Sequence, residues 1–162
     1  MPTEVPPTEV SPTDVSQNFW LSTSEQVAWR AVLEMFVETL SKLSSDLSPH
    51  GITLEDYEIL VHLSEAPQGR LRMSELAVLS MLSKSRLTYR IDRLAEREYV
   101  ERSVDRRDRR GLYASLTEGG QHFIEAVAPS HVRSVRARLT DRLNPAEFLE
   151  LGRLAQLVIS DP

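Results

Sequence analysis

Residues 82–120 read LSKSRLTYRIDRLAEREYVERSVDRRDRRGLYASLTEGG. The first half has the spacing of an amphipathic helix, because its apolar positions recur at intervals of four and three: Leu87, Ile91 and Leu94. Ser83 is placed to cap that helix, which we expect to run to about Glu98. Two stretches of alternating apolar residues, 99–104 and 112–116, follow the helix and predict a pair of short strands. The sequence therefore predicts a helix followed by a β-hairpin.

Charge is distributed unevenly around this stretch. The chain has a formal net charge of -5, yet residues 70–110 contain 12 Lys/Arg against 7 Asp/Glu, and the remainder contains 7 against 17. The most basic part is the hairpin loop SVDRRDRRG at 103–111. A basic segment in an acidic chain is typical of a surface that binds a polyanion, although a solvated charged helix face is the alternative.

Helical periodicity also precedes the stretch. Ser22 and Glu25 fit a capping box that opens a long helix ending near Pro49. Its apolar stripe consists of Trp29, Leu33, Phe36, Leu40, Leu43 and Leu47. Thr53 and Asp56 open a second helix, while the neighbouring acids Glu55 and Asp56 favour its N-terminal dipole. A short extended piece around Leu71 and a short helix capped by Ser74 come next.

Two more helices follow the hairpin. Thr117 caps a long one, which Pro129 should kink or interrupt. The tetrapeptide Asn-Pro-Ala-Glu at 144–147 is a strong helix start, with a cap, a proline at the first position and an acid at the third. We expect this last helix to bury Phe148, Leu151, Leu154 and Val158.

The remaining composition limits the class of protein. A chain of 162 residues suggests one domain, and it has no cysteine and no apolar run long enough to span a membrane. The proline-rich segment 1–18 predicts a disordered or loosely docked tail. With no membrane span, no secretory signal pattern and no cysteine, we expect a cytoplasmic protein. No phosphate loop or nucleophile motif occurs, so we also expect that it is not an enzyme and uses no cofactor or metal.

A helix-turn-helix with a hairpin beside it suits double-stranded DNA, because a helix fits the major groove. With the apolar positions of the 83–98 helix facing inward, four side chains face outward: Ser85, Arg86, Tyr89 and Arg93. Lys84 and Thr88 lie at the margin of that face. Arginines at a hairpin tip can enter the minor groove, and we assign this role to Arg106, Arg107, Arg109 and Arg110. Asp105 and Asp108 are placed to orient these arginines through charge-assisted hydrogen bonds.

The span from about 22 to 160 resembles the MarR family of transcriptional regulators. The similarity lies in the helix order, in LSKSRLTYRIDRLAEREYVERS and in DRRDRRGLYASLTEGG. The family's Asp-x-Arg-x-x-Arg-type wing motif is matched by Asp105, Arg107 and Arg110, and its Leu-Thr-x-x-Gly ending by Leu116, Thr117 and Gly120. The resemblance implies a mainly α fold with a small β-hairpin wing. It also implies a homodimer on a pseudo-palindromic operator, with a DNA-binding lobe at about 53–117 and dimerisation helices at about 22–48 and 117–160.

The resemblance further implies a small phenolic or anionic effector that releases DNA. Side chains on segments that could line its site are Trp29, Phe36, Tyr57, Glu58 and His62. For each of them a purely structural role is the alternative: Trp29 and Phe36 also fit a core stripe, and Glu58 also fits a solvent-facing position.

We therefore predict a dimeric, sequence-specific DNA-binding regulator, a repressor released by an effector. The alternatives are a winged-helix module that binds protein and an architectural DNA binder without an effector.

Overall fold

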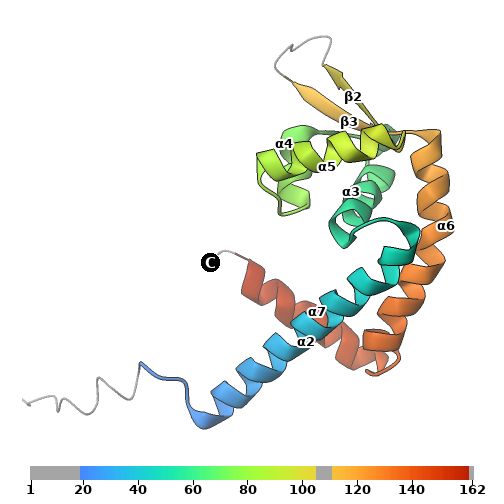
Figure 1. Cartoon of the computed structure of the whole chain (residues 1–162). Helices are drawn as coiled ribbons and strands as arrows, with labels where there is room; N and C mark the ends of the chain where they lie inside the picture. Colours follow the sequence, from blue (N-terminus) through green and yellow to red (C-terminus); the bar gives the residue numbers. More distant parts are fainter. Residues whose placement is uncertain (1–18, 105–110, 161–162) are drawn as a thin grey trace, which may run out of the picture. The chain divides into compact units, whose positions relative to one another are not determined.

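Figure 1 shows the chain as a computed structural model, in which residues 19–104 and 111–160 are described. The chain divides into two compact units, one before and one after the bond between Thr39 and Leu40. None of the described helices is long and apolar enough to cross a membrane. The expected tail at 1–18 and the charged centre of the wing loop at 105–110 lie outside the described residues.

The long first helix, α2, spans Thr23–Leu47. The predicted capping box is present: the backbone N–H of Ser22 donates to Glu25 Oε2 over 2.7 Å, and that of Glu25 donates to Ser22 Oγ over 3.3 Å. Only Leu43 and Leu47 of its apolar stripe are buried. The other four side chains of the stripe, Trp29, Leu33, Phe36 and Leu40, are exposed, so the core role given as the alternative for Trp29 and Phe36 is not found within this chain.

A compact lobe follows α2. Its elements are α3 (Leu54–Glu65), β1 (Arg70–Arg72), α4 (Met73–Leu79), α5 (Lys84–Glu96), β2 (Val100–Val104) and β3 (Leu112–Leu116). The side chains of Ile59, Leu60, Leu63, Leu76 and Ile91 are all 0% exposed and form the centre of the core. This core joins α3, α4, α5 and the sheet, so the exposed face of α5 is carried on a rigid support.

The sheet has three antiparallel strands in the order β1-β3-β2. The predicted hairpin is confirmed, with Val100 opposite Leu116 and Val104 opposite Leu112. The extended piece around Leu71 is confirmed too, and it adds a third strand that was not foreseen: Leu71 lies opposite Ala114, which is fully buried.

Two helix limits in the lobe differ from expectation. α4 begins at Met73 rather than after Ser74, because the Glu75 carboxylate accepts a hydrogen bond from the backbone N–H of Arg72 over 3.2 Å. Ser74 therefore lies inside the helix and does not cap it. α5 ends at Glu96 instead of Glu98, since Glu98 takes a left-handed conformation with φ of 60°.

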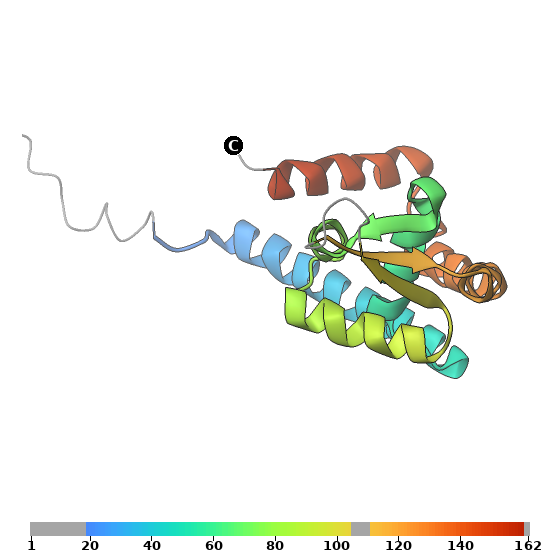
Figure 2. The same cartoon turned by 90° about the horizontal axis from the view of Figure 1, so that it is seen from above.

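The C-terminal helices start where the sequence predicts. Thr117 caps α6 (Glu118–Val135), and Asn144 caps α7 (Pro145–Ile159) with Pro145 at its first position. Pro129 does not interrupt α6; the irregular segment is a π-helical turn at Arg136–Thr140. Within the unit formed by residues 40–160, α6 runs away from the sheet and α7 folds back from its far end (Figure 1). In Figure 2 α6 is seen nearly end-on while α5 lies lengthwise, so the two helices are oriented crosswise.

Candidate DNA-binding site

The two faces of α5 differ as the sequence predicts. Leu87, Ile91 and Leu94 are at most 2% exposed and pack into the lobe. The opposite face presents Lys84, Ser85, Arg86, Tyr89 and Arg93 to solvent, with Thr88 partly buried at the margin. Ser83 caps the helix by accepting the backbone N–H of Arg86 over 3.3 Å. The helix therefore carries a continuous polar face with three cationic side chains.

Some of these side chains are held by neighbours on the same helix. Thr88 Oγ1 donates to the backbone oxygen of Lys84 over 2.9 Å, and Arg93 Nη1 lies 3.5 Å from the hydroxyl oxygen of Tyr89. The contact with Tyr89 fixes the direction of two long side chains that both face solvent. An exposed aromatic side chain, 57% exposed in the case of Tyr89, is suited to press on a sugar or a thymine methyl group.

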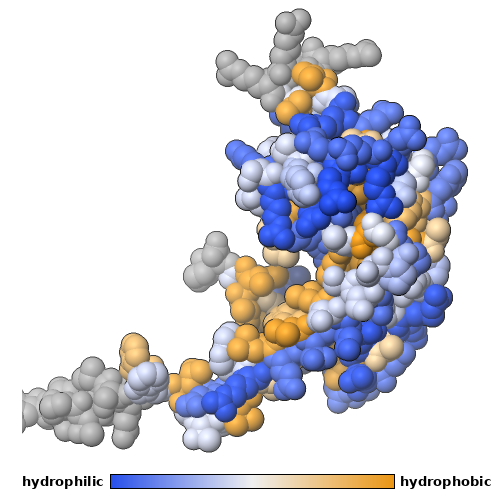
Figure 3. Space-filling view, viewed as in Figure 1, coloured by the Kyte–Doolittle hydropathy of each residue, from blue (hydrophilic) through white to orange (hydrophobic). Residues whose placement is uncertain are grey.

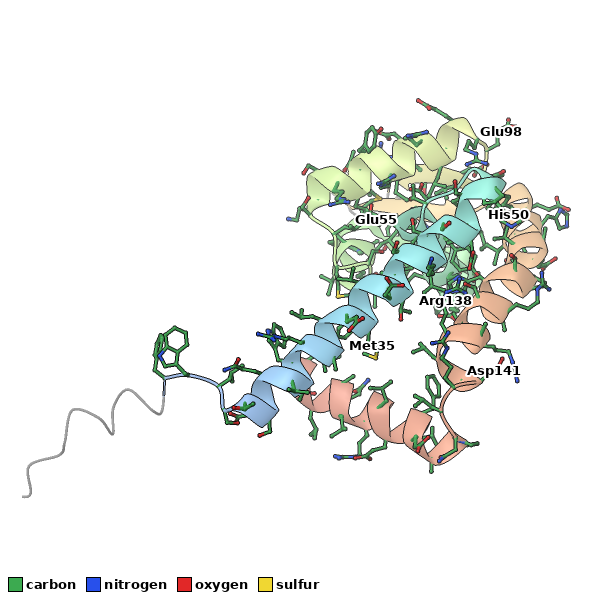
Figure 4. The ribbon with its side chains drawn as sticks, turned by 60° about the horizontal axis from the view of Figure 1, so that its bottom comes forward. Met35, His50, Glu55, Glu98, Arg138 and Asp141 are labelled. Carbon is green, nitrogen blue, oxygen red and sulfur yellow. The ribbon has the colours of Figure 1, made fainter. Side chains whose placement is uncertain are left out.

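Arg86 is held by a different element, the start of α3. Its Nε and Nη2 groups donate to the two carboxylate oxygens of Glu55 over 3.3 and 2.5 Å. Arg90 Nη2 lies 2.8 Å from the same carboxylate, and Arg90 Nη1 lies 3.5 Å from Asp56 Oδ2. Glu55 is labelled in Figure 4 on the side of the lobe where α5 lies. Glu55 and Asp56 were expected only to favour the dipole of α3. They also form ion pairs with two arginines of α5.

The wing is joined to α5 at the middle of β2, and its base is closed by contacts of Thr117 with the turn before β2. Arg102 of β2 forms an ion pair with Asp92 of α5. Thr117 Oγ1 donates to the backbone oxygen of Glu98 over 2.6 Å, and the Thr117 N–H donates to the backbone oxygen of Tyr99 over 3.1 Å. These contacts fix the hairpin relative to the exposed face of α5, so both can meet one duplex.

Two basic residues of β1 belong to the same surface and were not among the sequence candidates. The guanidinium carbon of Arg70 lies 3.9 Å from the ring centroid of Tyr113, and Arg72 Nε donates to the Tyr113 hydroxyl group over 2.9 Å. A hollow of about 280 Å³ between β1, α4, α5 and β3 is bordered by Arg72, Ser74, Lys84 and Thr88, among others. The sequence pattern that could have indicated Arg70 and Arg72 is the alternation of basic, apolar and basic residues at 70–72. A three-residue strand is too short for that pattern to stand out.

The comparisons with known proteins agree with this geometry. The family model described as "MarR family" matches residues 50–111. The crystal structure of AbsC, a MarR family transcriptional regulator from Streptomyces coelicolor, is 45% identical and has a TM-score of 0.83 over 86% of this chain and 94% of that one. The chain belongs to the MarR family.

Further relatives support that membership. Sco3205, another MarR family transcriptional regulator from Streptomyces coelicolor, was solved in complex with DNA; it is 36% identical, with a TM-score of 0.84 over 86% of this chain and 91% of that one. The HTH-type transcriptional repressor YetL from Bacillus subtilis is 30% identical over 65% of this chain and 67% of its own length. As a MarR-family member the chain is a transcriptional regulator, and not an enzyme.

The MarR wing motif is only partly visible. Asp105, Arg106, Arg107, Asp108, Arg109 and Arg110 lie outside the described residues. The end of the motif is described: Leu116 ends β3, Thr117 caps α6, and the backbone N–H of Gly120 donates to Thr117 Oγ1 over 2.9 Å.

The effector candidates of this MarR-family chain belong to both compact units. Trp29 and Phe36 belong to the unit before Leu40 and are 53% and 52% exposed. Tyr57 is a core residue at 5% exposure, and its ring centroid lies 4.5 Å from that of His131. Glu58 faces solvent, as its structural alternative states, although partial desolvation of its carboxyl group raises its pKa. No group of three or more potential metal ligands occurs among residues 19–104 and 111–160.

The helices assigned to dimerisation expose much of their apolar surface. Within this chain α7 buries none of its residues, so the burial expected for Phe148, Leu151, Leu154 and Val158 is not supplied by the chain itself. Leu154 is 46% exposed, Val158 84% and Val132 of α6 51%. Figure 3 shows hydrophobic surface over α7, while hydrophilic surface dominates the lobe that carries α5. Large apolar side chains exposed together on one face are typical of a protein–protein interface.

Proposed function

We propose that this MarR-family regulator is a homodimeric, sequence-specific DNA-binding repressor that a small effector releases from its operator. The observation that carries the proposal is the pair of surfaces presented by α5 and the hairpin. One face of α5 is polar and basic while the other is anchored in the core, and β2 and β3 extend beside it. A helix of this kind suits the major groove, and an arginine-rich hairpin tip suits the minor groove.

Each surface has its own part in the proposal. Arg86 and Tyr89 read base edges, and Arg93, Lys84, Ser85 and Thr88 contact the backbone or the margin of the groove. Arg106, Arg107, Arg109 and Arg110 enter the minor groove and Asp105 orients them. Arg72 adds positive charge next to Lys84, and Arg70 adds it beside Tyr113. The DNA complex of Sco3205, at 36% identity, supports DNA as the partner of these surfaces.

The dimer is the second part of the proposal. One recognition helix contacts too few base pairs to select a site, so two lobes must meet successive major grooves, about 34–36 Å apart. Residues 53–117 form the DNA-binding lobe. The exposed apolar side chains of 22–48 and 117–160 pair with those of a second copy. A pseudo-palindromic operator follows from the two-fold symmetry of such a dimer.

The effector is the third part. Trp29, Phe36, Tyr57, Glu58 and His62 are the residues assigned to an effector site for a phenolic or anionic molecule. Aromatic rings and an imidazole suit such a ligand, and the raised pKa of Glu58 lets its carboxyl group become neutral more readily beside an anion. A cytoplasmic location belongs to the same proposal.

The experiment that tests the proposal starts from the purified full-length chain and sheared genomic DNA. We expect retained fragments to share a pseudo-palindrome, and we expect binding to that sequence to fall steeply with salt through counterion release. Retention of a protein partner, with no dependence on salt, would indicate the protein-binding module. Equal retention of all fragments would indicate an architectural DNA binder.

A further inference from the structure

The carboxylate of Glu55 occupies an unusual place for a helix-start residue. It lies at the second position of α3 and accepts from two arginines of α5 at once. Asp56 already closes the capping box with Thr53, whose hydroxyl group donates to Asp56 Oδ2 over 2.7 Å. Capping at α3 therefore does not require Glu55, and its contacts point to α5.

The pair with Arg86 has the geometry of a fork. Nε and Nη2 of Arg86 each donate to a different oxygen of Glu55. A guanidinium group has five N–H donors in one plane, so this pair uses one edge and directs the edge formed by Nη1 and the second Nη2 hydrogen away from Glu55. That second edge has the spacing of two parallel donors, which matches O6 and N7 of guanine.

Glu55 is itself immobilised by a less exposed partner. The Arg90 side chain is 16% exposed and pairs with both Glu55 and Asp56, whereas the Arg86 side chain is 57% exposed. The direction of Arg86 thus depends on a network anchored at the start of α3. Bidentate pairs within a network are the surface ion pairs that do hold a side chain in place, in contrast to isolated pairs.

We propose that Glu55 is a specificity-determining residue that aims Arg86 at a guanine of the operator. The inference rests on the proposed function, since it requires α5 to enter the major groove. Holding a long side chain in its bound direction reduces the conformational entropy lost on binding. Because Arg86 remains solvent-exposed while paired, Glu55 orients the arginine and does not shield it from DNA.

An orienting role of Glu55 and a purely electrostatic role make opposite predictions for DNA binding. Glu55 carries a negative charge next to a face that meets phosphates, so on charge alone its removal should strengthen binding to any DNA. If Glu55 aims Arg86, its removal weakens discrimination at one base pair while binding to random DNA stays equal or becomes stronger.

The experiment begins with an operator selected by the wild-type protein from random DNA. Arg86→Ala identifies the base pair that Arg86 reads, as the one position where discrimination falls, on the order of tenfold. Glu55→Gln is then compared with the wild type on the operator and on the same operator with that pair replaced. Glu65→Gln, at the exposed last residue of α3, is the matched control because it removes the same charge from the same helix.

We expect Glu55→Gln to reduce discrimination at that base pair by roughly threefold or more, and Glu65→Gln to leave it unchanged. Glu55→Asp keeps the charge but shortens the side chain by one methylene group, so it should lose discrimination as well. In the Arg86→Ala background, Glu55→Gln should have no further effect. Thermal melting of each variant separates these effects from loss of folding.

Several results would overturn the inference. One is discrimination in Glu55→Gln equal to that of the wild type; another is tighter operator binding with discrimination retained, which would make Glu55 a mask for Arg86. A loss in Arg86→Ala that is uniform across sequences would make Arg86 a phosphate contact, and it would overturn the inference while leaving the proposed function intact. A wild-type protein that selects no sequence would overturn the proposed function itself.

Discussion

The backbone oxygen of Tyr99 lies 2.2 Å from the position that a Cβ atom would occupy at Gly120. Tyr99 precedes the first wing strand and Gly120 lies in the first turn of α6. The same oxygen accepts the backbone N–H of Thr117 over 3.1 Å. The base of the wing therefore closes against α6 at a distance that only a glycine permits.

Gly120→Ala should destabilise the protein, because the added methyl group would overlap a backbone atom that the sheet and the Thr117 cap hold in place. We expect a loss of about 1–3 kcal/mol in the free energy of unfolding, measured by urea denaturation. Gly119→Ala is the matched control: its Cβ would lie 3.4 Å from the backbone oxygen of Glu98, so stability should change little. Equal stability of the two variants would contradict the close approach.

Asp46→Ala should destabilise the junction between α2 and α6. Asp46 Oδ2 accepts from the buried Ser134 hydroxyl group over 2.5 Å and lies 2.8 Å from Arg138 Nη2. Its removal leaves a serine and a partly buried guanidinium group without this acceptor, which should cost about 1–2 kcal/mol in unfolding free energy. Asp141→Ala breaks the exposed pair with Arg136 and should leave the denaturation midpoint nearly unchanged.

His131 should make the folded state sensitive to mild acid. Burial lowers the pKa of His131 below the ordinary value of 6.5, and its Nδ1 is buried with no hydrogen-bond partner. The unfolded state therefore binds a proton at a pH where the folded state does not. Stability should be fully present above pH 6.5 and should decrease as the pH falls through that value toward the lowered pKa.

The measurement is thermal melting between pH 5.5 and 7.5. His131→Phe should flatten the dependence on pH, because the ring packed on Tyr57 is kept while the proton-binding site is lost. His122→Gln, at an exposed position on the same helix, should keep the wild-type dependence. A dependence on pH that is the same in His131→Phe and the wild type would assign the titration to another group.

Local signals account for the parts of the fold that the sequence predicts. Thr53 with Asp56, Thr117 with Gly120, and Asn144 with Glu147 are caps whose partners lie three residues apart, so each can be recognised in a short window. The inward and outward faces of α5 follow from the helical period in the same way. These signals sufficed to place the helices and the candidate DNA-reading residues.

The features that the sequence did not predict depend on residues far apart in the chain. Leu71 pairs with Ala114, and Glu55 contacts Arg86, 31 residues away. Composition near either partner gives no sign of such a contact. α7 illustrates a different limit: its period shows that Leu151, Leu154 and Val158 share an apolar face, but a period does not reveal what covers that face. The chain itself does not supply the burial expected for that face.

The wing arginines should contribute binding affinity without contributing stability. We expect Arg107→Ala and Arg110→Ala each to weaken operator binding by about 1–3 kcal/mol and to leave dimerisation and melting nearly unchanged. Asp105→Ala should also weaken binding, although it removes a negative charge, because the aspartate orients the arginines. Fluorescence anisotropy with labelled operator DNA measures each effect. Tighter binding by Asp105→Ala would refute the orienting role.

The exposed apolar face of α7 should be required for folding and for operator binding. Glutamate at both Leu151 and Leu154 would place charges in the proposed interface between copies, where a buried, unpaired charge is strongly unfavourable. We expect the double variant to lose folding and operator binding together, since the uncovered helices cannot be stable alone.

Leu149→Glu is the matched control for that double variant. Leu149 is 73% exposed and lies roughly on the opposite side of α7 from Leu151, because two residues correspond to about 200° around a helix. We expect this variant to remain dimeric and to bind DNA, because its new carboxylate stays in water. Light scattering of the wild-type protein at micromolar concentration supplies the decisive measurement. A compact, folded monomer there would show that the apolar face of α7 needs no second copy, and the dimeric part of the proposed function would be wrong.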